Sequence, residues 1–179
     1  ETLALDSGAG ITFGDAVGAG ISLGDVTVTD AANVTAAGTF AASSFTQGAG
    51  TGTTDFQGAL TLTNNFNFTG NNLTLSAAGN DIGGDFGFIN AGTFTITNAA
   101  DLTVTGLMQQ NGISTGDSSI GGDITANAIS FFAAGNVTLT DTVAMDTTSG
   151  NGDMIFAGAL LGGANDLTMD AGAGQIDFQ

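Results

Sequence analysis

The sequence predicts an all-β protein that winds as a parallel β-helix, or β-solenoid, of roughly eight or nine coils with about 20 residues each. Apolar and polar residues alternate along many short segments, which is the period of a strand with one buried face. Similar strand motifs recur along the chain, as they do in repeat proteins. The outward positions are mostly Thr, Ser and Asn, which can stack on like residues in neighbouring coils.

The expected strands are short, about four or five residues, and most begin with Asn or Asp followed by aliphatic and β-branched residues. In chain order, the clearest are 33–35, 66–69, 72–76, 86–89, 93–97, 101–105, 136–140 and 166–170. Breaks made of small residues are expected at 7–10, 48–50, 78–80 and 171–174. Because the chain contains no proline, every backbone N–H is free to donate to a neighbouring strand.

Short strands with regular breaks are also found in β-sandwiches and closed barrels, but two internal matches favour the solenoid. The tetrapeptide at 82–85 recurs at 120–123, which is 38 residues later. This spacing predicts two coils of about 19 residues and places Asp85 and Asp123 on one edge. The segment 3–13 also matches 167–178, after one inserted residue.

The match between the two ends has two interpretations. Residues 1–179 are expected to form a single β-solenoid domain, which is either an excerpt of a longer repeat array or a building block whose last coil resembles its first. Neither end carries an obvious polar cap, which a free solenoid end needs for solubility. Copies stacked end to end would cover both surfaces.

The charge composition excludes several classes of function. The chain has no Lys, Arg or His against 17 acidic residues, so its formal charge is −17 at pH 7. Ser-His-Asp catalysis, lyase chemistry that needs a basic residue, and nucleic-acid binding are therefore excluded. Paired carboxylates can hydrolyse glycosidic bonds, but the Trp and Tyr platforms of sugar-binding clefts are absent. We expect no enzyme and assign no catalytic or cofactor-binding residue.

Calcium is the one metal ion that the sequence makes worth testing, because Asp oxygens suit Ca²⁺. Six Gly-Asp dipeptides begin at Gly14, Gly24, Gly84, Gly116, Gly122 and Gly152. The nonapeptide of calcium-loaded β-rolls is absent, so we favour ordinary turn chemistry and assign no metal site. Divalent cations are expected as diffuse counter-ions to the uncompensated charge.

Four Asn-x-Ser/Thr sequons begin at Asn33, Asn67, Asn72 and Asn136. We interpret them as structural residues of a Thr- and Asn-rich β-chain, which would carry glycans only in a source that glycosylates Asn.

The Asx-aliphatic-Thr-aliphatic strands, together with the Gly-Ala-Gly turns that lead into Ile-Thr-Phe or Ile-Asp-Phe, resemble the β-strand repeats of large bacterial surface proteins. These include filamentous-haemagglutinin-type adhesins and the passenger regions of autotransporters. The resemblance implies a right-handed parallel β-helix, secretion, and an adhesive or scaffolding role.

The sequence therefore predicts a non-catalytic extracellular or cell-surface structural protein. It would be a self-assembling fibre subunit, or a stalk segment of a giant adhesin, that polymerises end to end with copies of itself through exposed strand edges. The alternative is an adhesive binding module that presents a solenoid face to a glycan or a host surface. No stretch approaches the roughly 18 consecutive apolar residues of a membrane helix, so no membrane-spanning segment is expected.

Overall fold

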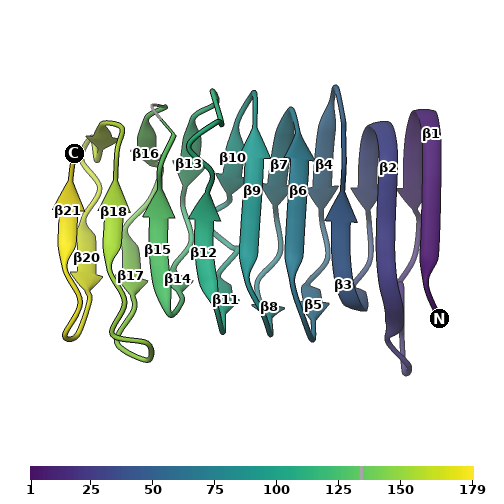
Figure 1. Ribbon diagram of the computed structural model, residues 1–179, viewed down its shortest axis with the longest axis horizontal. Coiled ribbons are helices and arrows are strands. Elements are labelled where there is room, and N and C mark those ends of the chain that lie inside the picture. Colours follow the sequence, from purple (N-terminus) through teal and green to yellow (C-terminus); the bar gives the residue numbers. More distant parts are fainter. Residues whose placement is uncertain (134) are drawn as a thin grey trace.

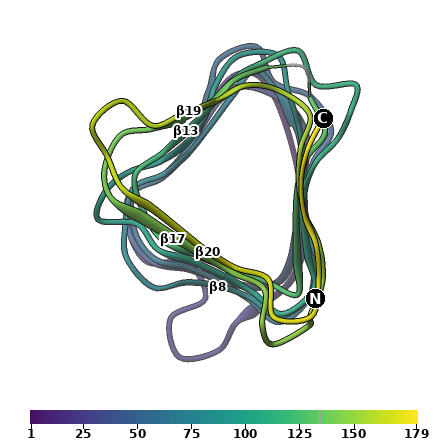
Figure 2. The same ribbon diagram turned by 90° about the vertical axis from the view of Figure 1, so that its left-hand side faces the viewer.

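The computed structural model describes residues 1–133 and 135–179, which form a parallel β-solenoid of about eight coils (Figure 1). The strands belong to one 21-stranded sheet in which every pairing is parallel, and no helix occurs in the described residues. Figure 2 looks along the axis from the C-terminal side, and the chain runs anticlockwise as it approaches the viewer. The solenoid is therefore right-handed, and the predicted fold class is confirmed.

Each coil has a triangular outline with three faces, which the chain visits in the order face 1, face 2, face 3 (Figure 2). Three long strands near the N-terminus turn corners and contribute to more than one face: β1 (Leu3–Phe13), β2 (Leu23–Ala36) and β3 (Phe40–Gln47). β1 begins on face 1 and continues onto face 2, whereas β3 begins on face 3 and continues onto face 1. β2 begins at the end of face 3 and continues over faces 1 and 2.

The remaining strands each lie on one face. Face 1 continues with β6 (Phe66–Gly70), β9 (Phe86–Asn90), β12 (Leu107–Gln110), β15 (Ala128–Phe131), β18 (Met154–Phe156) and β21 (Ile176–Phe178). Face 2 continues with β4 (Thr53–Phe56), β7 (Asn72–Leu75), β10 (Phe94–Ile96), β13 (Ser118–Ile120), β16 (Val137–Leu139) and β19 (Leu160–Leu161). Face 3 continues with β5 (Leu60–Leu62), β8 (Asn80–Ile82), β11 (Leu102–Val104), β14 (Ile124–Thr125), β17 (Val143–Asp146) and β20 (Leu167–Asp170).

The coil length varies more than the sequence predicted. Successive partners on face 1 are between 19 and 25 residues apart, and the longest coil runs from Ile129 to Met154. The strand positions stay in register because extra residues are accommodated at the corners, where the backbone is not constrained by the parallel pairing. The predicted strands at 66–69, 72–76, 86–89, 93–97, 101–105, 136–140 and 166–170 all coincide with observed strands.

The predicted break at 7–10 is wrong. β1 continues through these residues as one strand of 11 residues, although its register against β2 shifts between Leu5 and Ser7 and again between Ser7 and Gly10. The corner is therefore a bulged bend that keeps its pairing with the next coil. The breaks at 78–80 and 171–174 do form turns, because Gly79 (φ 78°) and Gly172 (φ 57°) adopt the left-handed conformation.

The interpretation of the 38-residue repeat is also wrong. Ile82 lies on face 3, where it pairs with Val104, whereas Ile120 lies on face 2, where it pairs with Ile96. The two matching tetrapeptides are thus not separated by a whole number of coils, and Asp85 and Asp123 lie at different corners. The match reflects the local chemistry of a strand that ends at a corner, which faces 2 and 3 share here.

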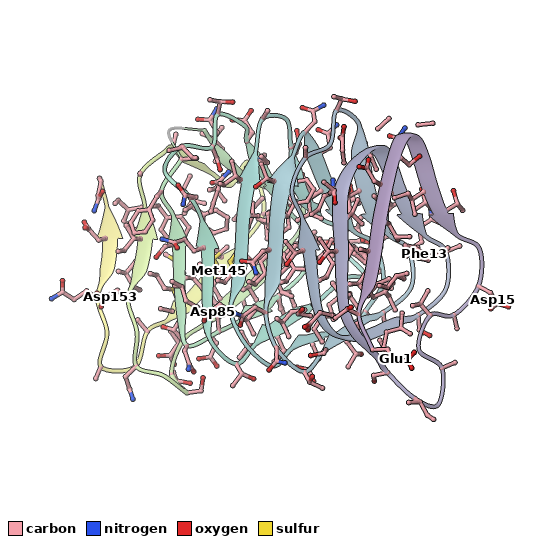
Figure 3. The ribbon with its side chains drawn as sticks, turned by 45° about the vertical axis from the view of Figure 1, so that its right-hand side comes forward. Glu1, Phe13, Asp15, Asp85, Met145 and Asp153 are labelled. Atoms are coloured by element: carbon pink, nitrogen blue, oxygen red, sulfur yellow. The ribbon has the colours of Figure 1, made fainter. Side chains whose placement is uncertain are left out.

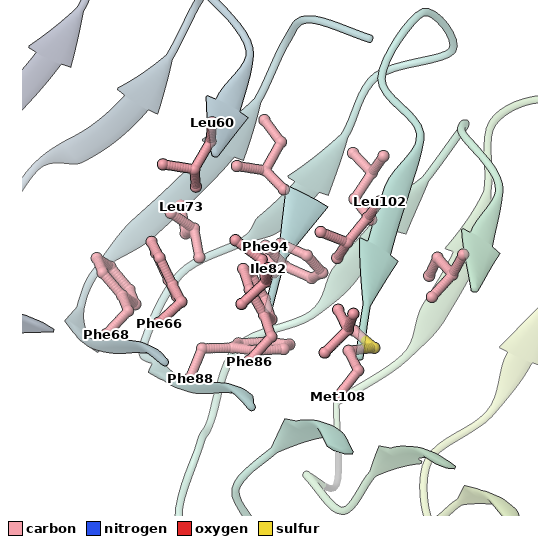
Figure 4. Close-up of a cluster of buried hydrophobic side chains, with 14 of the residues drawn as sticks. Leu60, Phe66, Phe68, Leu73, Ile82, Phe86, Phe88, Phe94, Leu102 and Met108 are labelled. Carbon is pink, nitrogen blue, oxygen red and sulfur yellow. The ribbon is translucent and has the colours of Figure 1, made fainter. Parts of the chain in front are cut away.

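The core is a set of columns of apolar side chains, one residue per coil. Phe45, Phe66 and Phe86 occupy equivalent positions on face 1, and their rings stack at centroid distances of 5.3 and 4.6 Å. Figure 4 shows this region, where leucines from faces 2 and 3 meet the phenylalanines. Phe131, Phe156 and Phe178 form a second stack nearer the C-terminus. Each coil therefore buries the apolar surface of its neighbour.

Phe66 provides a direct test of these columns because its side chain is fully buried between two stacked rings. We expect Phe66→Ala to lower the free energy of unfolding by about 3–5 kcal/mol, from lost burial and the cavity left behind. The neighbouring Asn67→Ala is the control, because this exposed residue lies on the same strand and should change stability by less than about 0.5 kcal/mol. Denaturant titration followed by circular dichroism measures both, and equal effects would contradict the column description.

Candidate functional site

The acidic side chains point outward, away from the apolar core. Asp85 and Asp153 lie at the surface in Figure 3, and the same holds for Asp15 near the N-terminal end. No cationic side chain exists in the sequence to pair with them. The outer surface of the solenoid therefore carries many carboxylates whose negative charge no cationic side chain compensates.

The corners contain a regular feature that the sequence reasoning missed. Asn or Asp residues that directly precede a strand, or that stand where a strand begins on face 2, accept through Oδ1 a hydrogen bond from a backbone N–H of the next coil. These bonds join Asn33 to Thr53, Asn72 to Thr93, Asp117 to Asn136, Asn65 to Asp85, Asp85 to Leu107, Asp153 to Gln175, Asp101 to Asp123, and Asp123 to Ala144. They are 2.7–3.1 Å long and span 19 to 22 residues. We call them the corner ladders.

The corner ladders occur at the start of all three faces. Asn33 lies where β2 enters face 2, and Asn72 is the first residue of β7 on that face. Asp85 precedes β9 on face 1, and Asp101 precedes β11 on face 3. The backbone N–H groups at the corners lie outside the regular strand pairing. The side-chain oxygens accept hydrogen bonds from these N–H groups, which would otherwise lack a protein acceptor. The signal in the sequence was the Asx residue before each strand, which we interpreted only as a turn former.

The six predicted calcium candidates fall largely into this structural role. Four of the six Gly-Asp aspartates, at positions 85, 117, 123 and 153, use Oδ1 to accept an amide of the next coil. Asp15 instead accepts a hydrogen bond from the amide of the adjacent Ala16, and Asp25 accepts one from the hydroxyl of Ser44, its partner in the next coil. No group of three or more His, Cys, Asp or Glu side chains that could hold a metal ion occurs among the described residues. The preference for ordinary turn chemistry over a specific calcium site stays a prediction.

The sequon residues divide in the same way. Asn33 and Asn72 use their side-chain oxygens in the corner ladders. Asn67 is exposed at an outward position of β6, and Asn136 is exposed before β16. The structural interpretation thus has a physical basis for the first two residues, whose amides already support the next coil.

Polar residues are buried at the corner between faces 1 and 2, against the expectation that they point outward. Asn90 and Gln110 occupy inward positions, and the amide of Gln110 donates to Oδ1 of Asn90 at 2.8 Å. The amide of Asn90 in turn donates to the carbonyls of Gly92 and Asp117. Two coils before Asn90 in the winding, Thr54 donates to Oε1 of Gln47. These bonds tie the turn to the strands on either side of it.

A shallow groove of about 660 Å³ lies along this same corner. Its lining includes Ala49, Gly70, Ile89, Ala91 and Ile113, and Ile113 is 71% exposed in the loop between β12 and β13. The polar atoms of the groove come from threonine and asparagine side chains and from Asp30. The groove offers apolar surface and hydrogen-bonding groups, but no pair of side chains arranged for acid–base chemistry.

The two ends of the solenoid leave strand edges and apolar side chains uncovered in the described chain. At the C-terminal side, Ile176 is 40% and Phe178 is 55% exposed, although both occupy inward positions. At the N-terminal side, Leu3, Leu5, Ile11 and Phe13 are half-buried against the core. The segments 3–13 and 167–178, which match in sequence, lie at these opposite ends, but the first spans faces 1 and 2 and the second spans faces 3 and 1.

Comparison with known proteins found no matching family model, no similar curated protein and no similar solved structure. The residues of the described chain contain no helix that is long and apolar enough to cross a membrane.

The corner ladders make a prediction at Asp85, whose carboxylate joins two neighbouring coils. Asp85→Ala removes the acceptor for the amide of Leu107, so we expect it to lower the free energy of unfolding by about 1 kcal/mol. Asp85→Asn keeps the Oδ1 acceptor and removes one negative charge, so it should retain the stability of the parent chain. Denaturant titration of the two variants measures the difference, and an Asn variant as unstable as the Ala variant would refute the ladder.

A second prediction concerns Asp146 at the end of β17. Hydrogen bonds from the side chain and backbone of Thr148 hold the pKa of Asp146 below its ordinary value of 3.8. Because this pKa is lowered on folding, the interaction stabilises the fold above the ordinary pKa and is lost as the pH falls through the lowered value. Thr148→Ala should move the pKa back toward 3.8, which an NMR titration of the Asp146 carboxyl would detect. An unchanged midpoint would show that the Thr148 hydroxyl plays no part.

Proposed function

We propose that this protein is a non-catalytic structural protein of the cell surface or extracellular space, acting as a fibre subunit or as a stalk segment of a larger adhesin. The observation that carries the proposal is the continuous parallel pairing from coil to coil on all three faces of the described chain. Exposed edges present unpaired N–H and C=O groups, which are templates for another chain. The function is mechanical: a rigid rod that extends by adding coils.

The chemistry of the side chains supports a non-catalytic role. The chain offers neither a basic side chain nor a cysteine for nucleophilic or acid–base catalysis. Its carboxylates lie outward, and many are engaged in the corner ladders rather than gathered in a cleft. A repeating frame of this kind transmits load through main-chain hydrogen bonds between coils, which need no reactive group.

The negative charge of the outer surface would keep neighbouring rods of the proposed fibre apart. Outward carboxylates on neighbouring rods repel one another, so sideways association is opposed. The same charge attracts divalent cations as counter-ions without any specific site.

An adhesive binding module is the second candidate, and the corner groove favours it. The groove combines an exposed apolar side chain, Ile113, with threonine and asparagine groups that can hydrogen-bond a glycan or a peptide. In this role the rod would display the groove at one corner rather than polymerise.

Electron microscopy of the purified chain tests the first proposal against the second. Long fibres of uniform width are expected if the strand edges pair end to end. Dispersed rods of a single length would contradict the fibre subunit and favour the binding module. Analytical ultracentrifugation over a range of protein concentrations provides the solution counterpart, because end-to-end growth increases with concentration.

Lateral bundling supplies a further prediction. Mild acid, or calcium at millimolar concentration, should increase light scattering because protonation or divalent counter-ions relieve the repulsion between rods. Sodium chloride at the same ionic strength is the control for simple screening. Scattering that responds to neither acid nor calcium would show that the carboxylates do not keep the rods apart.

A further inference from the structure

The sequence contains two Asn-Gly pairs, Asn111-Gly112 and Asn151-Gly152, and both Asn side chains are exposed. In such a pair the main-chain nitrogen of the second residue can attack the side-chain amide carbon of the first, because glycine has no side chain to hinder the approach. In a folded protein the attack depends on the hydrogen bonds that this nitrogen and this side chain already make. The two pairs differ in these bonds.

The Asn111-Gly112 pair lies in the loop between β12 and β13, at the top of Figure 1, and this loop is longer than its neighbours. The strand positions on either side of the loop, Gln110 and Ser118, are eight residues apart. The equivalent positions are six residues apart both one coil earlier and one coil later. The longer loop carries Asn111, Gly112 and Ile113 at the surface, where all three are exposed.

The amide nitrogen of Gly112 donates no hydrogen bond among the described residues, although the amides on either side of it do. The amide of Asn111 donates to the carbonyl of Phe88 at 2.9 Å, and the amide of Ile113 donates to Oδ1 of Asn111 at 3.1 Å. The second bond closes an Asx turn, which folds the Asn111 side chain back along the main chain that follows it. A donor on Oδ1 also stabilises the negative charge that develops there when the amide carbon is attacked.

The Asn151-Gly152 pair is held by bonds between coils. The amide of the half-buried Gly152 donates to the carbonyl of Asn127 at 3.1 Å. Oδ1 of Asn151 accepts the amide of Ala173 in the next coil, also at 3.1 Å. An attack by the Gly152 nitrogen would break its bond to the preceding coil and displace a side chain that supports the following one. The bonding that joins the coils therefore protects this pair.

We propose that Asn111 is a site of spontaneous modification by water, which converts it to aspartate and isoaspartate, whereas Asn151 stays intact in the folded protein. The nitrogen of Gly112 bonds to Cγ of Asn111 and gives up its proton, and the side-chain nitrogen leaves as ammonia. The product is a succinimide ring. Water then opens the ring: cleavage of the bond between Cγ and nitrogen gives aspartate, and cleavage of the bond to the main-chain carbonyl carbon gives isoaspartate. One water enters, one ammonia leaves, and no oxidant or reductant is needed.

The modification falls at the edge of the corner groove. Ile113, which lines the groove, follows two residues after Asn111. An aspartate at position 111 adds one negative charge there and keeps the main chain unchanged. An isoaspartate adds a methylene group to the main chain and would displace Ser114, whose hydroxyl accepts the amide of the buried Asn90 at 3.3 Å. The two products therefore differ: the first changes the charge of the groove, and the second also loosens the buried polar corner.

Mass spectrometry of the full chain tests the proposal. The protein is incubated in mildly alkaline buffer, once folded and once in guanidinium chloride, and is then cleaved before aspartate. This cleavage places the two pairs in separate peptides, 101–116 and 146–152, so each mass increase of one dalton is assigned to one Asn. Aspartate at position 111 creates a new cleavage site and isoaspartate does not, which separates the two products.

In the folded protein, we expect the Asn151 peptide to be unchanged when half of Asn111 has converted. In guanidinium chloride both should convert at similar rates, because the bonds between coils are gone. Equal rates at Asn111 and Asn151 in the folded protein would overturn the proposal. A folded protein in which neither changes, while both change in guanidinium chloride, would also overturn it.

The variant Gly112→Ala tests the attacking nitrogen. A Cβ at this position would meet only the carbonyl oxygen and Cβ of Phe132, at ordinary contact distances of 3.6 and 3.7 Å, so the variant should fold. Its methyl group hinders the attack. We expect conversion of Asn111 to be at least tenfold slower, equivalent to a barrier higher by about 1.4 kcal/mol. Circular dichroism verifies the fold, and an unchanged rate in the folded variant would show that the Gly112 nitrogen is not the nucleophile.

Discussion

Parallel main-chain hydrogen bonding between successive coils is the constraint on which the rest of the structure depends. It fixes the distance from one coil to the next, so a residue at a given strand position always faces the equivalent residue of its neighbours. This is why Phe45, Phe66 and Phe86 stack ring on ring, and why apolar columns take the place of a core built from sequence-distant elements. The absence of proline fits this constraint, because a proline within a strand would remove a backbone hydrogen bond to the neighbouring coil.

The backbone at the corners is not held by this pairing, and most of the variation in coil length occurs there. Coil length changes from 19 to 25 residues on face 1 without disturbing the strands, because the extra residues are placed in the turns. The relaxed backbone would leave amides without partners, and the Asx residues of the corner ladders supply the acceptors. The aspartates therefore have two roles: one oxygen stabilises the next coil, while the negative charge stays at the surface.

The same geometry connects the fold to the proposed assembly. A solenoid that pairs its coils through open edges has no intrinsic stop, so its ends differ from its middle only in lacking a neighbour. Here the ends keep the inward apolar residues of an interior coil, with Phe178 stacked on Phe156 but half exposed. In the proposed fibre, the outward carboxylates would discourage contact along the sides of neighbouring rods and so favour growth along the axis.

The sequence by itself determined the fold class, most of the strands and the apolar columns, because strict alternation leaves only one face of each strand for the core. It also determined the chemical character of the surface, since no rearrangement can supply a missing lysine or histidine. Only the tertiary structure decided how the strands are divided among three faces. The recurrence of Ile-Gly-Gly-Asp looked like two coils, yet its copies lie on faces 3 and 2. The local sequence specifies a strand that ends at a corner. The number of residues in the preceding turns determines on which of the three faces that strand lies.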